Sequence, residues 1–124
     1  MWVIACVVVI AASTAHAASI FDFDRWMAQI EKRALSLQKS LDRNDPRTGV
    51  DDAREIATLY RATEEYFVAS GDAARAAELS RKGWQDADAI ASRVTAGDYD
   101  GARVLIRTMM EDCRTCHREY KPLY

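Results

Sequence analysis

Two cysteines and a histidine near the end of the chain, in the run Cys113-Arg114-Thr115-Cys116-His117, have the types and spacing to do chemistry. The pattern C-x-x-C-H is the signature of c-type haem attachment. Two thiols three positions apart lie on one side of a helix, so each can add to a vinyl group of a porphyrin and form a thioether. The imidazole that follows can then ligate the iron from its proximal side. The sequence therefore predicts one haem c per chain, held by Cys113 and Cys116 with His117 on the iron.

The first 17 residues have the pattern of a secretory signal peptide. Residues 1–20 contain no Lys, Arg, Asp or Glu, Trp2 to Ala12 is apolar, and Ala15-His16-Ala17 offers an A-x-A cleavage site. We expect cleavage after Ala17, a periplasmic location, and one domain over residues 18–124. An uncleaved membrane anchor is the alternative, because no Lys or Arg precedes an uncharged stretch about long enough to span a bilayer of roughly 30 Å. Small and polar residues in the second half of the stretch favour cleavage.

The count of cysteines and histidines after cleavage limits the other functions of the motif. Two cysteines and one histidine remain, all three in the motif. A structural zinc site needs four ligands and finds three. A thioredoxin-like motif needs alternating strands and helices, which the chain lacks. A disulfide between Cys113 and Cys116 would leave His117 without a role. Because the one histidine is committed to the motif, a hydrolytic Ser-His-Asp site is not expected, and we predict no enzyme activity.

Charge gives little indication of a partner. The chain has 17 basic and 19 acidic residues, for a net charge of −2, and the two signs are interspersed. Without a basic run or an acidic tail, we expect no nucleic-acid binding. After cleavage of the leader we expect no stable membrane insertion. Redox proteins are the expected partners, and a homodimer is possible.

Breaks and apolar periodicity predict four helices. Pro46 and Gly49 mark a loop over residues 42–49. The runs Ser70-Gly71-Asp72 and Ala96-Gly97-Asp98 each place a glycine that can end one helix before an aspartate that can cap the next. Apolar residues recur every three or four positions between these breaks, over about Ile20–Leu41, Asp51–Ser70, Asp72–Thr95 and Asp98–Lys121.

Short links between the last three helices require antiparallel neighbours, so the predicted fold is all-α, an up-down-up-down four-helix bundle. The start of helix one, the end of helix two, the start of helix three and the end of helix four then meet at one end. His117 places the haem at that end. Its expected neighbours are Phe23, Trp26, Met27, Tyr66, Phe67, Ala73, Ala74, Ala76 and Ala77. The alanines leave room that a porphyrin can fill, although alanine is also the best helix former.

With this layout the chain resembles the cytochrome c′ family, in particular its c556-like branch, whose members are exported four-helix bundles with the haem motif near the C-terminus. The run from Cys113 to Lys121 is similar to the family pattern C-x-x-C-H-x-x-[YF]-[RK]. The resemblance implies that Tyr120 and Lys121 occupy the aromatic and basic positions beside the haem. The mature chain is shorter than is usual in that family, so its loops and haem pocket need not match in detail.

The residue opposite His117 on the iron decides the function. Met27 lies on the inward stripe about two turns into helix one, at the haem end. In c556-like proteins a methionine at a similar place is the sixth iron ligand, which would make this protein a single-electron carrier. If Met27 only packs in the core, the alternative is a five-coordinate, cytochrome c′-like protein that binds nitric oxide or carbon monoxide. A third possible function is that of a haem subunit in a larger oxidoreductase.

Overall fold

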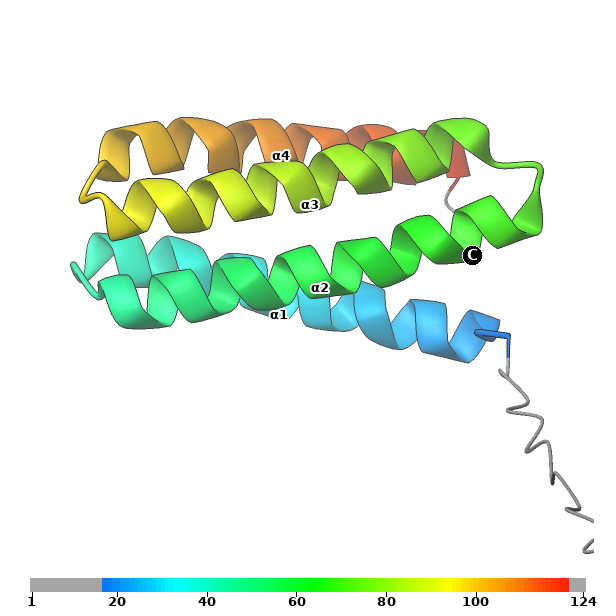
Figure 1. Ribbon diagram of the computed structural model, residues 1–124, viewed down its shortest axis with the longest axis horizontal. Helices are drawn as coiled ribbons and strands as arrows, with labels where there is room; N and C mark the ends of the chain where they lie inside the picture. Colours follow the sequence, from blue (N-terminus) through cyan, green and yellow to red (C-terminus); the bar gives the residue numbers. More distant parts are fainter. Residues whose placement is uncertain (1–16, 121–124) are drawn as a thin grey trace, which may run out of the picture.

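Four helices, antiparallel from one to the next, make up the described part of the chain (Figure 1). The computed structural model describes residues 17–120, so of the expected leader only Ala17 falls within it. The helices are α1 (Ile20–Asp42), α2 (Pro46–Ser70), α3 (Ala74–Thr95) and α4 (Tyr99–Tyr120). The predicted all-α, up-down-up-down four-helix bundle is confirmed. Within residues 17–120, none of these helices is long and apolar enough to cross a membrane.

Local signals explain where most helices begin and end. The Ser19 hydroxyl accepts a hydrogen bond from the Asp22 amide (3.3 Å), and the Asp22 carboxylate accepts one from the Ser19 amide (2.9 Å). This capping box starts α1. Gly71 (φ 74°) and Gly97 (φ 76°) adopt the left-handed conformation after α2 and α3, as their sequence context predicts. The Asp98 carboxylate accepts a hydrogen bond from the Gly101 amide at 2.9 Å and so caps α4.

Two details of the predicted boundaries are wrong. The loop expected over residues 42–49 is shorter, because Pro46 takes the first position of α2, where its fixed φ suits a helix and its missing N–H is not needed. Asp45 caps this helix by accepting a hydrogen bond from the Thr48 amide at 3.2 Å. Asp72 does not cap α3. The residue at the N-cap is Ala73, and no side chain there makes a capping hydrogen bond.

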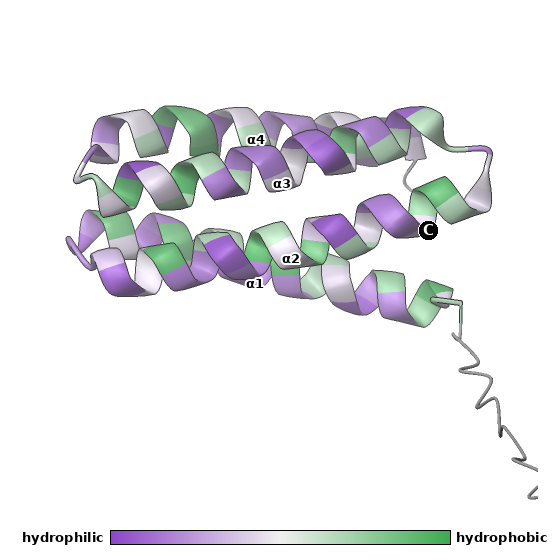
Figure 2. Ribbon diagram, viewed as in Figure 1, coloured by the Kyte–Doolittle hydropathy of each residue, from purple (hydrophilic) through white to green (hydrophobic). Residues whose placement is uncertain are grey.

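In α1, α2 and α4, burial of the apolar side chains falls toward the motif end of the bundle. In α1 the stripe from Ile30 to Leu41 is buried, whereas Phe23 and Met27 on the same stripe are half-buried. In α4, Ile106 and Met109 are buried but Cys113 is half-buried. Figure 2 shows hydrophobic residues continuing into the first turn of α1 and the last turns of α2. Apolar side chains at the motif end are therefore present but only partly covered.

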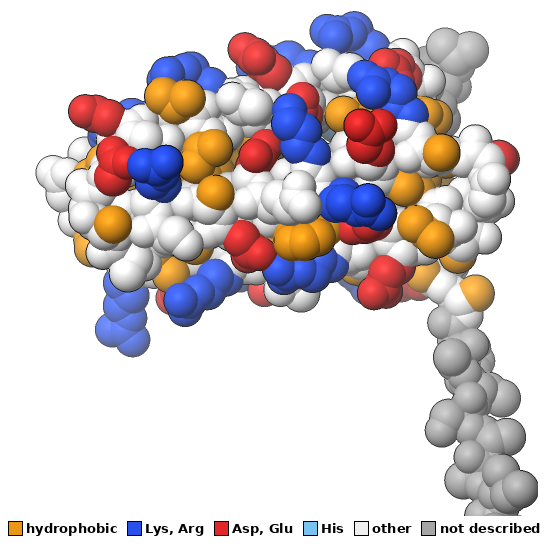
Figure 3. Space-filling view, turned by 45° about the horizontal axis from the view of Figure 1, so that its top comes forward, with side chains coloured by type: hydrophobic (Ala, Val, Ile, Leu, Met, Phe, Trp, Pro, Cys, Tyr) orange, Lys and Arg blue, Asp and Glu red, His pale blue; other side chains and the backbone are white. Residues whose placement is uncertain are grey.

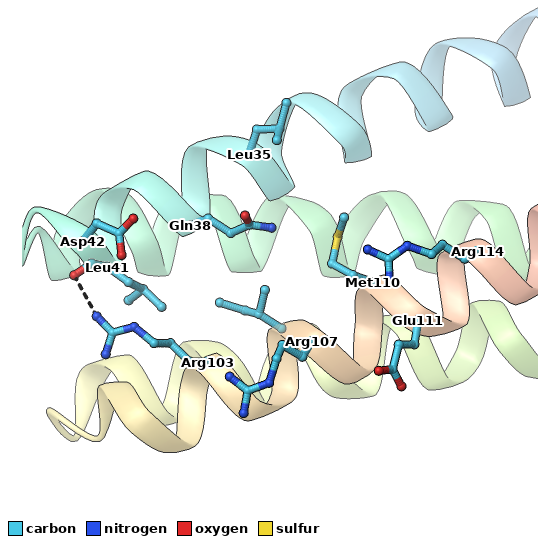
Figure 4. Close-up of a pocket in the computed structure, with 10 residues that line it drawn as sticks. Leu35, Gln38, Leu41, Asp42, Arg103, Arg107, Met110, Glu111 and Arg114 are labelled. Carbon is cyan, nitrogen blue, oxygen red and sulfur yellow. Dashed lines mark hydrogen bonds between the residues drawn. The ribbon is translucent and has the colours of Figure 1, made fainter.

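The loose end follows from how the helices pair. Contacts between α1 and α2, between α2 and α3, and between α3 and α4 are extensive, whereas α1 and α4 barely touch. Figure 4 shows the ribbons of these two helices diverging from Leu41 and Arg103 toward Arg114, which lies in the motif. On the face seen in Figure 3, acidic and basic side chains are interspersed, as the sequence predicts.

Candidate functional site

The three residues of the C-x-x-C-H motif lie in the last turns of α4. Cys113 and Cys116 are free thiols, and both are half-buried. His117 is exposed. Among residues 17–120, no group of three or more His, Cys, Asp or Glu side chains comes together as a metal site requires.

Both thiols are in surroundings that keep them protonated. Burial raises the pKa of the Cys113 thiol, and a hydrogen bond from the Tyr60 hydroxyl opposes that rise. Burial and the neighbouring Cys113 raise the pKa of Cys116 to about 11. At neutral pH both residues thus carry S–H groups. The S–H bond is the one that breaks when a thiol adds to a vinyl group. The donor set fits haem c.

Cys113 makes a side-chain contact that the sequence did not reveal. The Tyr60 hydroxyl of α2 lies 2.8 Å from the Cys113 sulfur. Tyr60 is 8% exposed, and burial raises its pKa well above the ordinary value. Tyr60 follows the apolar spacing of α2, but nothing local in the sequence indicates that its hydroxyl reaches α4. Gly83, an isolated glycine inside α3, is a signal that could have found the contact, because such a glycine can have a packing role.

Aromatic side chains gather at the same end of the bundle. The Phe23 ring of α1 stacks on the Tyr66 ring of α2 with centroids 5.1 Å apart. Phe67 contacts Phe23 edge-on at 5.3 Å and Tyr120 at 6.3 Å. The structure thus brings together predicted neighbours of the haem from three helices, and Phe67 links α2 to the end of α4. Trp26 joins them with an edge-on contact to Tyr66, at 6.4 Å between ring centroids. Lys121, which was also predicted beside the haem, lies outside the described residues.

The alanines at the start of α3, which were expected to leave room for a porphyrin, differ in their burial. Ala73, Ala76 and Ala77 are buried, whereas Ala74 is exposed. Open space does border this segment: a hollow of about 350 Å³ is lined by Ala74 and Ala77 together with Phe67, Val68 and Gly71. This hollow lies between the end of α2 and the start of α3.

A larger groove, of about 540 Å³, runs between α1 and α4 (Figure 4). Its apolar lining includes Leu41 of α1 and Ile106 and Met110 of α4. Arg114, which belongs to the motif, lines its end, so the groove leads toward the two motif cysteines. Met109, next to the groove residue Met110, is fully buried in the core.

One hydrogen bond marks the register of α1 against α4. The Arg103 guanidinium donates to the Leu41 carbonyl oxygen at 3.4 Å. Met27 precedes Leu41 by 14 residues, and His117 follows Arg103 by 14 residues. Because the two helices run antiparallel, both residues lie about 21 Å from this contact toward the same end of the bundle.

Helical spacing also puts these two residues on the facing sides of their helices. Met27 is 14 residues from Leu41, and His117 is seven residues from Met110, so each shares a helix face with a residue that lines the groove. Met27 is half-buried and packs against the core. The two predicted iron ligands thus occupy matching levels on the helices that border the groove.

Comparison of the chain with protein-family models, with curated proteins and with solved structures gives no match.

Proposed function

We propose that this chain is an exported, periplasmic monohaem c-type cytochrome that carries single electrons between redox proteins and is not itself an enzyme. The observation that carries the proposal is the pair of free, half-buried thiols one turn apart on α4, followed directly by His117. These donors stand at the loosely covered end of the bundle, beside half-buried aromatic rings. The resemblance to c556-like cytochromes supports the same assignment.

Cys113 and Cys116 would hold haem c, and His117 would ligate its iron. Bound there, the group supplies an iron centre that gains and loses one electron. The chain's own contribution would be a partly apolar setting: Phe23, Tyr66 and the neighbouring rings would cover one side of the site. A drier surrounding lowers the local dielectric constant, which is one means by which a protein tunes a haem potential.

Met27 is the proposed distal ligand. Its level and its helix face match those of His117 on the opposite side of the groove. The divergence of α1 from α4 favours this role, because two helices in direct contact leave no room for a planar ring between them. As a ligand, the Met27 thioether would raise the potential of the iron.

Binding of nitric oxide or carbon monoxide at a five-coordinate iron is the second candidate function. The specific observation in its favour is the weak contact between α1 and α4. Since little packing holds the start of α1 against α4, Met27 has freedom to stay in the core and leave the distal side open.

An optical spectrum of the protein produced in a host that attaches haem c tests both functions. A sharp low-spin α band in the ferrous protein that carbon monoxide barely alters supports electron transfer with Met27 bound. A broad high-spin Soret band that sharpens with carbon monoxide supports gas binding. A colourless protein with only its peptide mass would contradict both.

A further inference from the structure

Tyr60 and Cys113 meet across the interior of the bundle, although 53 positions separate them in sequence. Tyr60 comes from α2 and Cys113 from α4, and these two helices do not follow one another in the chain. A buried tyrosine hydroxyl needs a hydrogen-bond partner, because leaving it unpaired costs free energy. Within the described residues, the Cys113 sulfur is the one side-chain partner that the Tyr60 hydroxyl has.

Gly83 of α3 makes this contact possible. A Cβ atom at position 83 would lie 2.9 Å from Cδ1 and Cγ of the Tyr60 ring, closer than real Cβ contacts allow. The missing side chain lets the ring lie against the α3 backbone. From there the hydroxyl points to α4. Three helices thus set the position of a single oxygen atom.

The two motif cysteines differ in this respect. Among residues 17–120, the Cys116 thiol makes no side-chain hydrogen bond, whereas the Cys113 thiol is tied to Tyr60. Cys116 lies one turn further along α4, beside Glu119, which pairs with Arg75 of α3 at 3.1 Å. One thiol of the pair therefore has a preset orientation and the other does not.

We propose that Tyr60 is a positioning residue for haem attachment, whose hydroxyl orients the Cys113 sulfur toward the vinyl group to which it adds. In that step the Cys113 S–H adds across the vinyl double bond: a carbon–sulfur bond forms, the π bond breaks, and the proton goes to the other vinyl carbon. No oxidant or reductant is consumed. The inference rests on the proposed function, because it assumes that Cys113 forms a thioether.

The test is Tyr60→Phe, which removes the hydroxyl and keeps the ring, produced in a host that attaches haem c. Tyr99→Phe is the matched control, because it removes a hydroxyl from a half-buried tyrosine at the opposite end of the bundle. We expect the fraction of chains attached through Cys116 alone to rise about fivefold in Tyr60→Phe, the factor that one ordinary hydrogen bond is worth. Tyr99→Phe should match the wild type.

Two readouts distinguish one thioether from two. The alkaline pyridine haemochrome spectrum shifts when a vinyl group remains unreacted, and alkylation followed by peptide mass spectrometry identifies which cysteine is still a thiol. A wild-type chain without covalent haem would overturn the proposed function, and this inference with it. Two thioethers at wild-type yield in Tyr60→Phe would overturn the inference alone.

A structure of the haem-loaded wild-type protein tests the inference without any variant. We expect the Tyr60 oxygen to stay within hydrogen-bond distance of the Cys113 sulfur. A hydroxyl turned away from that sulfur would contradict the proposal even if Tyr60→Phe fails to fold.

Discussion

At the scale of single residues, the site depends on side chains from three parts of the sequence. The motif supplies two thiols and an imidazole within five positions of α4. Met27 of α1 lies at the level of His117, as helical rise from the Arg103–Leu41 contact indicates. Tyr60 of α2 reaches Cys113 because Gly83 leaves room for its ring. Replacement of single side chains therefore tests the separate roles.

Met27→Ala should convert the iron from low spin to high spin and lower its potential, because the thioether is lost. The absorption spectrum and a redox titration measure both effects. Met110→Ala is the control: Met110 also borders the groove, but it lies on the same helix as His117 and should leave the spectrum unchanged. If Met27→Ala also has an unchanged spectrum, another residue or none is the distal ligand.

Replacing both thiols, Cys113→Ala with Cys116→Ala, should abolish covalent haem and leave the motif end of the bundle poorly packed. Acid extraction followed by intact mass measurement detects the attached group. Thr115→Ala, between the two cysteines, is the control and should keep full attachment. Haem that resists extraction from the double variant would defeat the assignment of the motif.

At the scale of helices, one ion pair ties α1 to α2 where their packing is tight. Arg33 donates to the Asp52 carboxylate at 2.9 Å, and the Asp52 side chain is 1% exposed while that of Arg33 is 42% exposed. Among the described residues, the second Asp52 oxygen has no hydrogen-bond partner. The carboxylate thus depends on a single cation, which reaches it from the neighbouring helix.

Arg33→Ala should lower the free energy of unfolding by about 2 kcal/mol, because it leaves a buried carboxylate unpaired. The loss should stay below the roughly 3–5 kcal/mol of a fully buried pair, since water reaches the Arg33 side. Urea unfolding monitored by circular dichroism measures the change.

Arg25→Ala is the matched control for this ion pair. It breaks the exposed Arg25–Asp22 pair within α1, and water compensates both partners, so its effect should be much smaller. Equal losses in the two variants would mean that the Arg33–Asp52 pair does not stabilise the α1–α2 contact.

At the scale of the whole molecule, the bundle is tightly packed at one end and only partly covered at the motif end. The buried core runs through Leu37, Ile56, Ile90 and Ile106 and thins toward the motif. Phe21 at the start of α1 is 80% exposed, and Val68 near the end of α2 is 61% exposed. The motif end consequently has less buried apolar surface to stabilise it than the end that holds the α1–α2 and α3–α4 links. Covalent haem would supply the missing apolar contacts.

This asymmetry predicts a graded pattern of amide hydrogen exchange. In the chain with both motif cysteines replaced by alanine, protection should be highest in residues 30–41, 53–60 and 87–94. It should be lowest in the first two turns of α1 and the last turns of α2, where few contacts oppose local opening. Haem attachment in the wild type should raise protection mainly at that end. Uniform protection without haem would contradict the gradient.

The sequence alone was sufficient for the helices, their antiparallel order and the location of the motif at one end of the bundle. Apolar spacing, left-handed glycines and short links are local signals, so they can be read without knowing what packs on what. The same signals misplaced the start of α2, since Pro46 begins the helix instead of interrupting it. They also assigned Asp72 a capping role that it does not have.

Only the tertiary structure decided how α1 lies against α4 and which side chains meet inside the bundle. The periodicity of apolar residues indicates which face of a helix is buried, but it does not indicate whether two neighbouring helices touch or diverge. The groove depends on that divergence, whereas the Tyr60–Cys113 contact depends on how α2, α3 and α4 pack together. Both join positions tens of residues apart, and the distance between such positions is set by the packing of all four helices together.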